Sequence, residues 1–260
     1  MDYGAVLLSE NDGEISLNRE IVQDDLAFAQ AIVDALCQCM VPPPQPALPN
    51  SNSLQGNLCE FCVWELGENH WNWYRRKFSR PANAWNPWRD SSDPGIDILA
   101  TDEEVSILMV IEVKSSQGDG DGLIKNKTNS LRSDFERLFE GDGRGRLLSR
   151  VMEVAFDLKF LRDRPDLAEK VRRLVGSSPL GSPGVRLIGV LVCACGDGQS
   201  HNKRRQAFEN LHTWLTQNDV DAARKWKTEQ CRYYTVELKD LIGWIEELKK
   251  PRKGSPGEQL

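Results

Sequence analysis

Three charged residues interrupt apolar segments that are otherwise typical of buried strands. Asp97 lies within the segment Ile96–Ala100, and Glu112 and Lys114 lie within Ser106–Lys114. Successive residues of a strand face opposite sides, so Asp97 faces away from the isoleucines that flank it, and Glu112 and Lys114 share one face. A hairpin of these two strands would bring all three charges to one edge of a sheet. Because unpaired buried charges cost several kcal/mol, we expect a compensating ion there.

The chemistry of these residue types points to phosphate. Two carboxylates that face one point are hard oxygen ligands suited to Mg²⁺ or Mn²⁺. Lys114 could orient or help to deprotonate an attacking water and stabilise a pentavalent phosphate. Gly95 precedes the first strand and would let a nucleic-acid backbone approach closely. The alternative interpretation is a solvent-exposed hairpin whose Glu–Lys pair contributes little to stability.

The spacing Gly-Ile-Asp, a short gap and then Ile-Glu-Val-Lys resembles the motif of the PD-(D/E)XK nuclease superfamily, which has the restriction-endonuclease-like fold. By this resemblance Asp97 and Glu112 bind the metal and Lys114 serves the attacking water. Folds of this superfamily begin with a helix that in some members carries a further glutamate of the metal shell. Glu60, within GNLCEFCVWELG, fits that position best, and Glu65 is the alternative. A glutamate on the surface of an amphipathic helix is an equally good reading of Glu60.

The order of the remaining predicted elements agrees with an α/β fold. Hydrophobic periodicity predicts helices over 50–79, 131–139, 147–161, 201–217 and 238–250, and strands over 185–195 and 233–237. The nearly continuous apolar segment at 185–195 is typical of a central strand covered on both faces. Over about residues 51–195 this order follows the αβββαβ core of the PD-(D/E)XK superfamily, a mixed central sheet flanked by helices.

Charge and proline content divide the chain into unequal parts. Helical spacing from Asn18 to Met40 predicts an amphipathic helix, which the proline-rich segment that follows cannot continue. We therefore expect an acidic N-terminal helical extension with a spacer over 1–49, a nuclease-like domain over 50–250 and a polar tail over 251–260. Residues 1–50 carry eight acidic residues and one basic residue, and the whole chain has a net charge of −6. The remaining 210 residues are thus at +1, which argues against tight non-specific DNA binding by this chain alone.

Basic residues on both sides of the predicted hairpin are candidates for contact with nucleic acid. Five of the eight tryptophans lie between Trp64 and Trp88 among basic residues, a pattern that suits base stacking or, equally, a core with a basic rim. The candidates for phosphate contact are Arg75, Arg76, Lys77, Lys125, Lys127, Arg144 and Arg146. A solvated helix face is the simpler explanation of any single one of them.

A narrower resemblance covers about residues 51–116. The helix segment GNLCEFCVWELG, the basic and aromatic segment, PGIDIL and IEVKSS are together similar to the nuclease subunits of the Hachiman anti-phage defence system. This resemblance implies DNA as substrate, a helicase protein as partner and a role in antiviral defence. The predicted function is a magnesium-dependent DNA endonuclease. The alternatives are a catalytically silent nucleic-acid-binding or protein-binding module on the same fold, and a stand-alone restriction or repair nuclease.

Several other classes of protein find no support in the sequence. No apolar run is long enough to span a membrane, and the first residues lack the pattern of a signal peptide. Seven irregularly spaced cysteines do not resemble a secreted disulfide framework, so we expect a cytoplasmic protein. Cys59 and Cys62 lie in an apolar helical stripe and are predicted to be core residues. The glycine-rich acidic segment 115–122 is predicted to be a mobile lip over the site.

Overall fold

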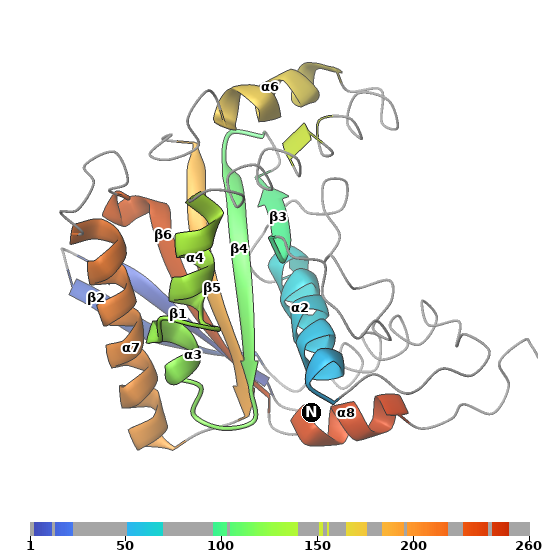
Figure 1. Ribbon diagram of the computed structural model, residues 1–260, viewed down its shortest axis with the longest axis vertical. Coiled ribbons are helices and arrows are strands. Elements are labelled where there is room, and N and C mark those ends of the chain that lie inside the picture. The colour runs from blue at the N-terminus through green and yellow to red at the C-terminus, as the bar shows by residue number, and fades with distance from the viewer. Residues whose placement is uncertain are drawn as a thin grey trace, which may run out of the picture.

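The protein is built around a six-stranded mixed sheet with helices on both faces (Figure 1). The computed structural model describes residues 3–11, 14–22, 51–69, 96–102, 105–139, 151–152, 155, 165–175, 184–194, 197–217, 226–238 and 241–249. The strands are β1 (Tyr3–Asn11), β2 (Glu14–Val22), β3 (Ile98–Thr101), β4 (Leu108–Ser116), β5 (Val185–Ala194) and β6 (Cys231–Leu238). The helices are α2 (Ser51–Asn69), α3 (Gly122–Lys125), α4 (Leu131–Phe139), α6 (Pro165–Val175), α7 (Gly198–Gln217) and α8 (Leu241–Lys249), with a 3₁₀ turn at Thr228–Gln230.

The strand order is β2-β1-β6-β5-β4-β3. Strands β4, β5 and β6 are parallel, and antiparallel strands flank them: β3 pairs with β4, β1 pairs with β6, and β2 pairs with β1. Helices connect the parallel strands, as parallel pairing requires. β5 is buried along nearly all of its length because helices cover both faces of the sheet, which confirms the central strand predicted from its apolar sequence.

Alternation along β4 divides the core into two layers. Leu108 and Val110 belong to the apolar cluster that includes residues of α4 and α7, whereas Met109 and Ile111 belong to the cluster that includes residues of α2 and α8. Figure 1 shows the same division, with α3, α4 and α7 on one side of the sheet and α2 and α8 on the other. Glu112 and Lys114 continue the series of Leu108 and Val110 and therefore lie on the α4 side.

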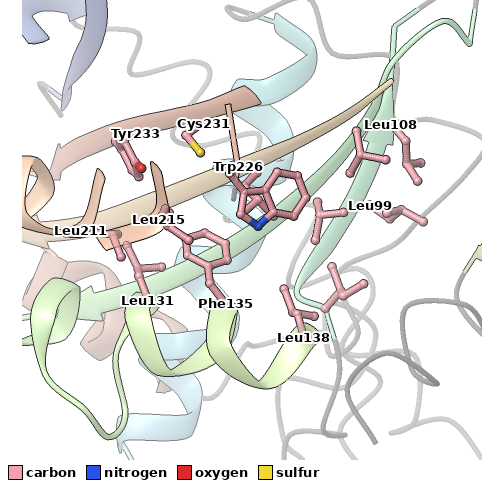
Figure 2. Packing of buried hydrophobic residues seen from close by; sticks show 14 of the residues in the cluster. Leu99, Leu108, Leu131, Phe135, Leu138, Leu211, Leu215, Trp226, Cys231 and Tyr233 are labelled. Atoms are coloured by element: carbon pink, nitrogen blue, oxygen red, sulfur yellow. The ribbon is translucent and has the colours of Figure 1, made fainter. Parts of the chain in front are cut away.

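The core on the α4 side is a dense cluster of large side chains (Figure 2). Leu131, Phe135 and Leu138 of α4 point toward the sheet. Leu211 and Leu215 of α7 pack on the same cluster. Burial of each such side chain stabilises the fold by about 1.5 to 3 kcal/mol. This packing fixes the position of α4 relative to β4, on which the candidate site depends.

The helices and strands predicted between residues 96 and 139, and those predicted after residue 184, are present with small changes of boundary. The predicted helix at 131–139 has the same bounds as α4. The predicted strand at 233–237 is present as β6, which is longer at both ends. Helix α7 begins three residues before the predicted His201, because Asp197 Oδ1 accepts a hydrogen bond from the Ser200 amide at 2.9 Å and caps it.

The N-terminal prediction is wrong at its start. Residues 14–22 form β2, not the first turn of a helix from Asn18, and the rest of that predicted helix lies outside the described residues. Apolar residues at Ile15, Leu17 and Ile21 have the even spacing of a strand, which helical spacing further along the chain obscured. Because β1 and β2 extend the same sheet through β6, residues 3–22 are part of the main fold and not a helical extension.

The resemblance to the αβββαβ core is matched only in its coarse features. The described residues contain two strands, β3 and β4, between α2 and α3, where the superfamily has three. Of the helix predicted at 147–161, the structure describes residues 151, 152 and 155 as helical. What the structure establishes is an α/β fold with a mixed central sheet covered by helices.

Candidate active site

The register of the β3–β4 hairpin places Asp97 beside Glu112. Ile98 pairs with Ile111, so the residue before Ile98 lies next to the residue after Ile111. The Val113 amide donates a hydrogen bond of 2.7 Å to Asp97 Oδ2, and the Asp97 and Glu112 carboxyl groups are hydrogen-bonded to each other. The sequence-based expectation that a hairpin joins these two residues is therefore correct.

One detail of that expectation is wrong. Ile96 and Ile98 were predicted to share a face, but Ile96 packs in the α4-side cluster and Ile98 in the α2-side cluster. The chain bends at Asp97 and β3 begins only at Ile98, so strict strand alternation does not extend back to Ile96. The bend lets the Asp97 side chain turn toward β4 instead of standing on one face of the sheet.

Lys114 meets an acidic residue that the sequence analysis did not single out. Its ammonium group forms an ion pair with Asp134 of α4, whose second carboxylate oxygen pairs with the exposed Arg137. Asp134 lies in the same helical stripe as the core residues Leu131 and Phe135 and is itself buried. A buried aspartate in an apolar stripe needs a cationic partner, and this signal could have identified it from the sequence.

Glu60 reaches the same group of charges from α2. Its side chain is 9% exposed, and Oε2 has no hydrogen-bond partner. The negative charge of Asp97 raises the pKa of Glu60 and the positive charge of Lys114 lowers it, which places Glu60 within electrostatic reach of both. Glu65 lies on the same helix, and its side chain is outside the described part of the chain.

Burial shifts the acidic groups of this site toward their protonated forms. Burial raises the pKa of Asp97 from 3.8 to about 6, although Lys114 and the Val113 amide oppose the change. The pKa values of Glu112 and Glu60 are also raised, first by burial and then by the nearby charge of Asp97. Burial lowers the pKa of Lys114, but Asp134 and Asp97 outweigh it and the net pKa is raised. The site therefore combines a stable ammonium group with carboxyl groups that hold their protons to higher pH than exposed carboxyl groups do.

The donor chemistry of the site suits a hard divalent cation. No three His, Cys, Asp or Glu side chains of the described residues are grouped so that they could hold a metal ion as they stand. However, Glu60 Oε2 is an orphaned buried acceptor, and the hydrogen bond between Asp97 and Glu112 requires a shared proton. A cation would be a partner for Glu60 Oε2 and would replace the proton shared by Asp97 and Glu112. Carboxylate oxygens are the ligands that Mg²⁺ and Mn²⁺ take.

Helix α2 is attached to the end of β4 by a chain of polar contacts. The Gln55 amide donates to Ser115 Oγ at 3.1 Å, and the Gln117 amide donates to Gln55 Oε1 at 2.9 Å. Cys59 is also hydrogen-bonded to Ser115, and burial raises the pKa of its thiol, which makes it a poor nucleophile. Cys59 and Cys62 lie in the α2-side core, as predicted. These contacts hold α2, and with it Glu60, against the end of β4 that carries Lys114.

The glycine-rich segment after β4, predicted to be a mobile lip, contacts α7 through Asp119. Asp119 accepts a hydrogen bond from Lys203 Nζ at 2.8 Å and a second from the Ser200 hydroxyl. Gly120 has a φ of +72°, and a Cβ there would lie 2.9 Å from both methyl groups of Leu191, so only glycine fits this turn. Buried Arg204 of α7 in turn pairs with buried Glu237 of β6.

Few of the predicted nucleic-acid contacts lie in the described residues. Lys125 is exposed at the end of α3 and forms an ion pair of 2.6 Å with Asp121, and Lys127 is exposed in the loop that follows. Gly95, Arg75, Arg76, Lys77, Arg144 and Arg146 lie outside the described residues.

Comparisons with protein-family models, curated proteins and solved structures found no match to this chain. Among the helices that the structure describes, none is long and apolar enough to cross a membrane. The residues of the site and the sequence motifs that they form therefore carry the information about function.

Proposed function

We propose that the protein is a magnesium-dependent DNA endonuclease of the PD-(D/E)XK type. The observation that supports this proposal best is the convergence of Asp97, Glu112 and Lys114 at one hairpin, with Glu60 approaching from α2. Three acidic groups around one ammonium group are an expensive arrangement for a merely structural site, because each buried charge needs compensation. Such arrangements with perturbed pKa values are typical of functional sites.

The residues divide the chemistry of phosphodiester hydrolysis among them. Bound Mg²⁺ or Mn²⁺ would neutralise phosphate charge and make a coordinated water more acidic. Asp97 and Glu112 would hold the ion, and the unsatisfied carboxylate oxygen of Glu60 is suited to the same shell. The Lys114 ammonium group would stabilise the charge that develops on the phosphate and orient the attacking water.

A catalytically silent binding module on the same fold is the second candidate. The observation in its favour is the ion pair between Lys114 and Asp134, which provides the lysine with a structural partner. The two candidates differ in metal binding. A nuclease requires a divalent cation held by Asp97 and Glu112, whereas a structural Glu–Lys pair does not.

A more specific proposal is that this nuclease is a cytoplasmic anti-phage effector that acts on DNA together with a helicase. Its support is the similarity of residues 51–116 to Hachiman nuclease subunits and the small net charge of the chain after residue 50, which favours delivery of DNA by a partner. Co-purification of a helicase with this protein from its native cells tests it. A rate of cleavage that a helicase partner leaves unchanged would favour a stand-alone restriction or repair nuclease.

Calorimetry and DNA cleavage together test the main proposal. Titration of Mg²⁺ or Mn²⁺ into the wild type and Glu112→Gln should give binding only in the wild type, and plasmid and single-stranded DNA should be cut only by the wild type. Glu136→Gln is the matched control, because it makes the same change on the exposed side of α4. Metal binding that survives Glu112→Gln unchanged would contradict the proposed site.

A further inference from the structure

The ion pair between Lys114 and Asp134 joins the candidate catalytic strand to a helix that the sequence motif does not include. The Lys114 side chain is 24% exposed and that of Asp134 is 9% exposed. The charges of Asp97 and Glu112 also act on Lys114, so the ammonium group is paired with the carboxylate of α4 and lies within electrostatic reach of the carboxyl pair of the hairpin. The ion pair with Asp134 is the contact that sets its position.

Asp134 is itself rigidly held. The Ser130 amide donates to Ser133 Oγ at 2.9 Å and the Ser133 amide donates to Ser130 Oγ at 3.2 Å, so two buried serines cap the first turn of α4 reciprocally. Phe135, the residue after Asp134, is buried in the α4-side core. Arg137 then pairs with the carboxylate oxygen that Lys114 does not use. Asp134 therefore has little freedom to follow a moving lysine.

We propose that Asp134 is a positioning residue that fixes the Lys114 ammonium group beside Asp97 and Glu112 for the reaction. This inference rests on the proposed nuclease function. A lysine has a flexible four-carbon stem, and its ammonium group is useful to a phosphate only if its place is set before the reaction. A charged partner on a packed helix sets that place, in the way that supporting residues orient the groups of other active sites. Asp134 acts through Lys114 and need not touch DNA.

A double-mutant cycle tests this role. Asp134→Asn keeps the size of the side chain and removes its charge, and it should lower kcat for DNA cleavage by about 10- to 100-fold with KM for DNA changed less than about twofold. In a Lys114→Ala background the same substitution should have almost no further effect, because the group that it positions is gone. Glu136→Gln, two residues further along α4, should change neither constant.

The Lys114 ammonium group gives a readout that does not depend on cleavage. A held ammonium group gives a ¹H–¹⁵N cross peak that exchange with water removes from free lysines. The peak of Lys114, assigned with Lys114→Arg, should be present in the wild type and in Glu136→Gln and absent in Asp134→Asn. Should Asp134→Asn fail to fold, Asp134→Glu moves the carboxylate by one methylene and should weaken the peak and lower kcat in parallel.

The outcomes separate this inference from the proposed function. A peak that persists in Asp134→Asn, additive effects of the two substitutions on kcat, or a kcat that rises in Asp134→Asn would each overturn the positioning role. A wild type that retains the Lys114 peak but neither binds Mg²⁺ or Mn²⁺ nor cuts DNA, alone or with a helicase partner, would refute the nuclease and would leave the ion pair as a structural contact.

Discussion

Asp97 and Glu112 share a hydrogen bond across the β3–β4 hairpin, although both side chains are carboxylic acids. Two buried carboxyl groups can share such a bond only while one of them keeps its proton. The pair therefore responds to pH and to cations in a way that an isolated surface carboxylate does not.

Stability without metal should fall as the pH rises from about 4 to 7. The pKa of Asp97 is raised from 3.8 to about 6, so in this interval the folded protein binds a proton that the unfolded chain has lost. The free energy of unfolding then decreases with pH, by about 3 kcal/mol for this group. Urea unfolding of the wild type and Asp97→Asn in the presence of a chelator measures the difference, and equal pH slopes would contradict the shift.

Divalent cations should reverse this loss. At pH 7.5 and at a concentration about 100 times the dissociation constant, Mg²⁺ should stabilise the wild type by about 2.7 kcal/mol, because the ion binds only the folded state. Thermal unfolding should show the increase for the wild type and for Glu136→Gln but not for Asp97→Asn. The same increase in Asp97→Asn would place the ion elsewhere.

The ion pair between Arg204 and Glu237 should matter for stability and not for cleavage chemistry. Both side chains are almost fully buried, at 3% and 1% exposure, and Arg204 also approaches the carbonyl oxygen of Asp119 at 3.5 Å. Arg204→Met removes the guanidinium from a buried carboxylate and should cost about 3 to 5 kcal/mol, most of which Arg204→Met with Glu237→Met should restore.

The neighbouring Arg205 supplies the control for this experiment, because it is exposed and its ion pair with Glu209, at 2.9 Å, lies on the surface of α7. Arg205→Met should cost less than about 1 kcal/mol in the same urea titrations. Equal costs for the two arginines would show that burial does not determine the strength of the Arg204 pair.

Local patterns were sufficient to predict the hairpin and the central strand. Alternation around Glu112 and Lys114 predicted the faces of β4 correctly, whereas the bend at Asp97 broke the alternation expected between Ile96 and Ile98. The nearly continuous apolar run of β5 could only be a strand covered on both faces.

These local patterns could not predict contacts between residues that are far apart in the sequence. The partner of Lys114 comes from α4 and that of Glu237 from α7, and neither pairing follows from spacing along the chain. The strand character of residues 14–22 was masked by helical spacing further along the sequence, and it shows in the pairing of β2 with β1, which in turn pairs with β6. The contacts of Asp119 with α7 likewise join segments far apart in the sequence.

Lys114→Ala gives the most direct test of the central claim. Plasmid and single-stranded DNA should be incubated with Mg²⁺ or Mn²⁺ and the wild type, Lys114→Ala or Lys170→Ala, an exposed lysine of α6, with the folded state checked by circular dichroism. We predict cleavage by the wild type and Lys170→Ala and a rate at least about 100-fold lower for folded Lys114→Ala. Metal-dependent cleavage that is undiminished in Lys114→Ala would contradict the assignment of the active site.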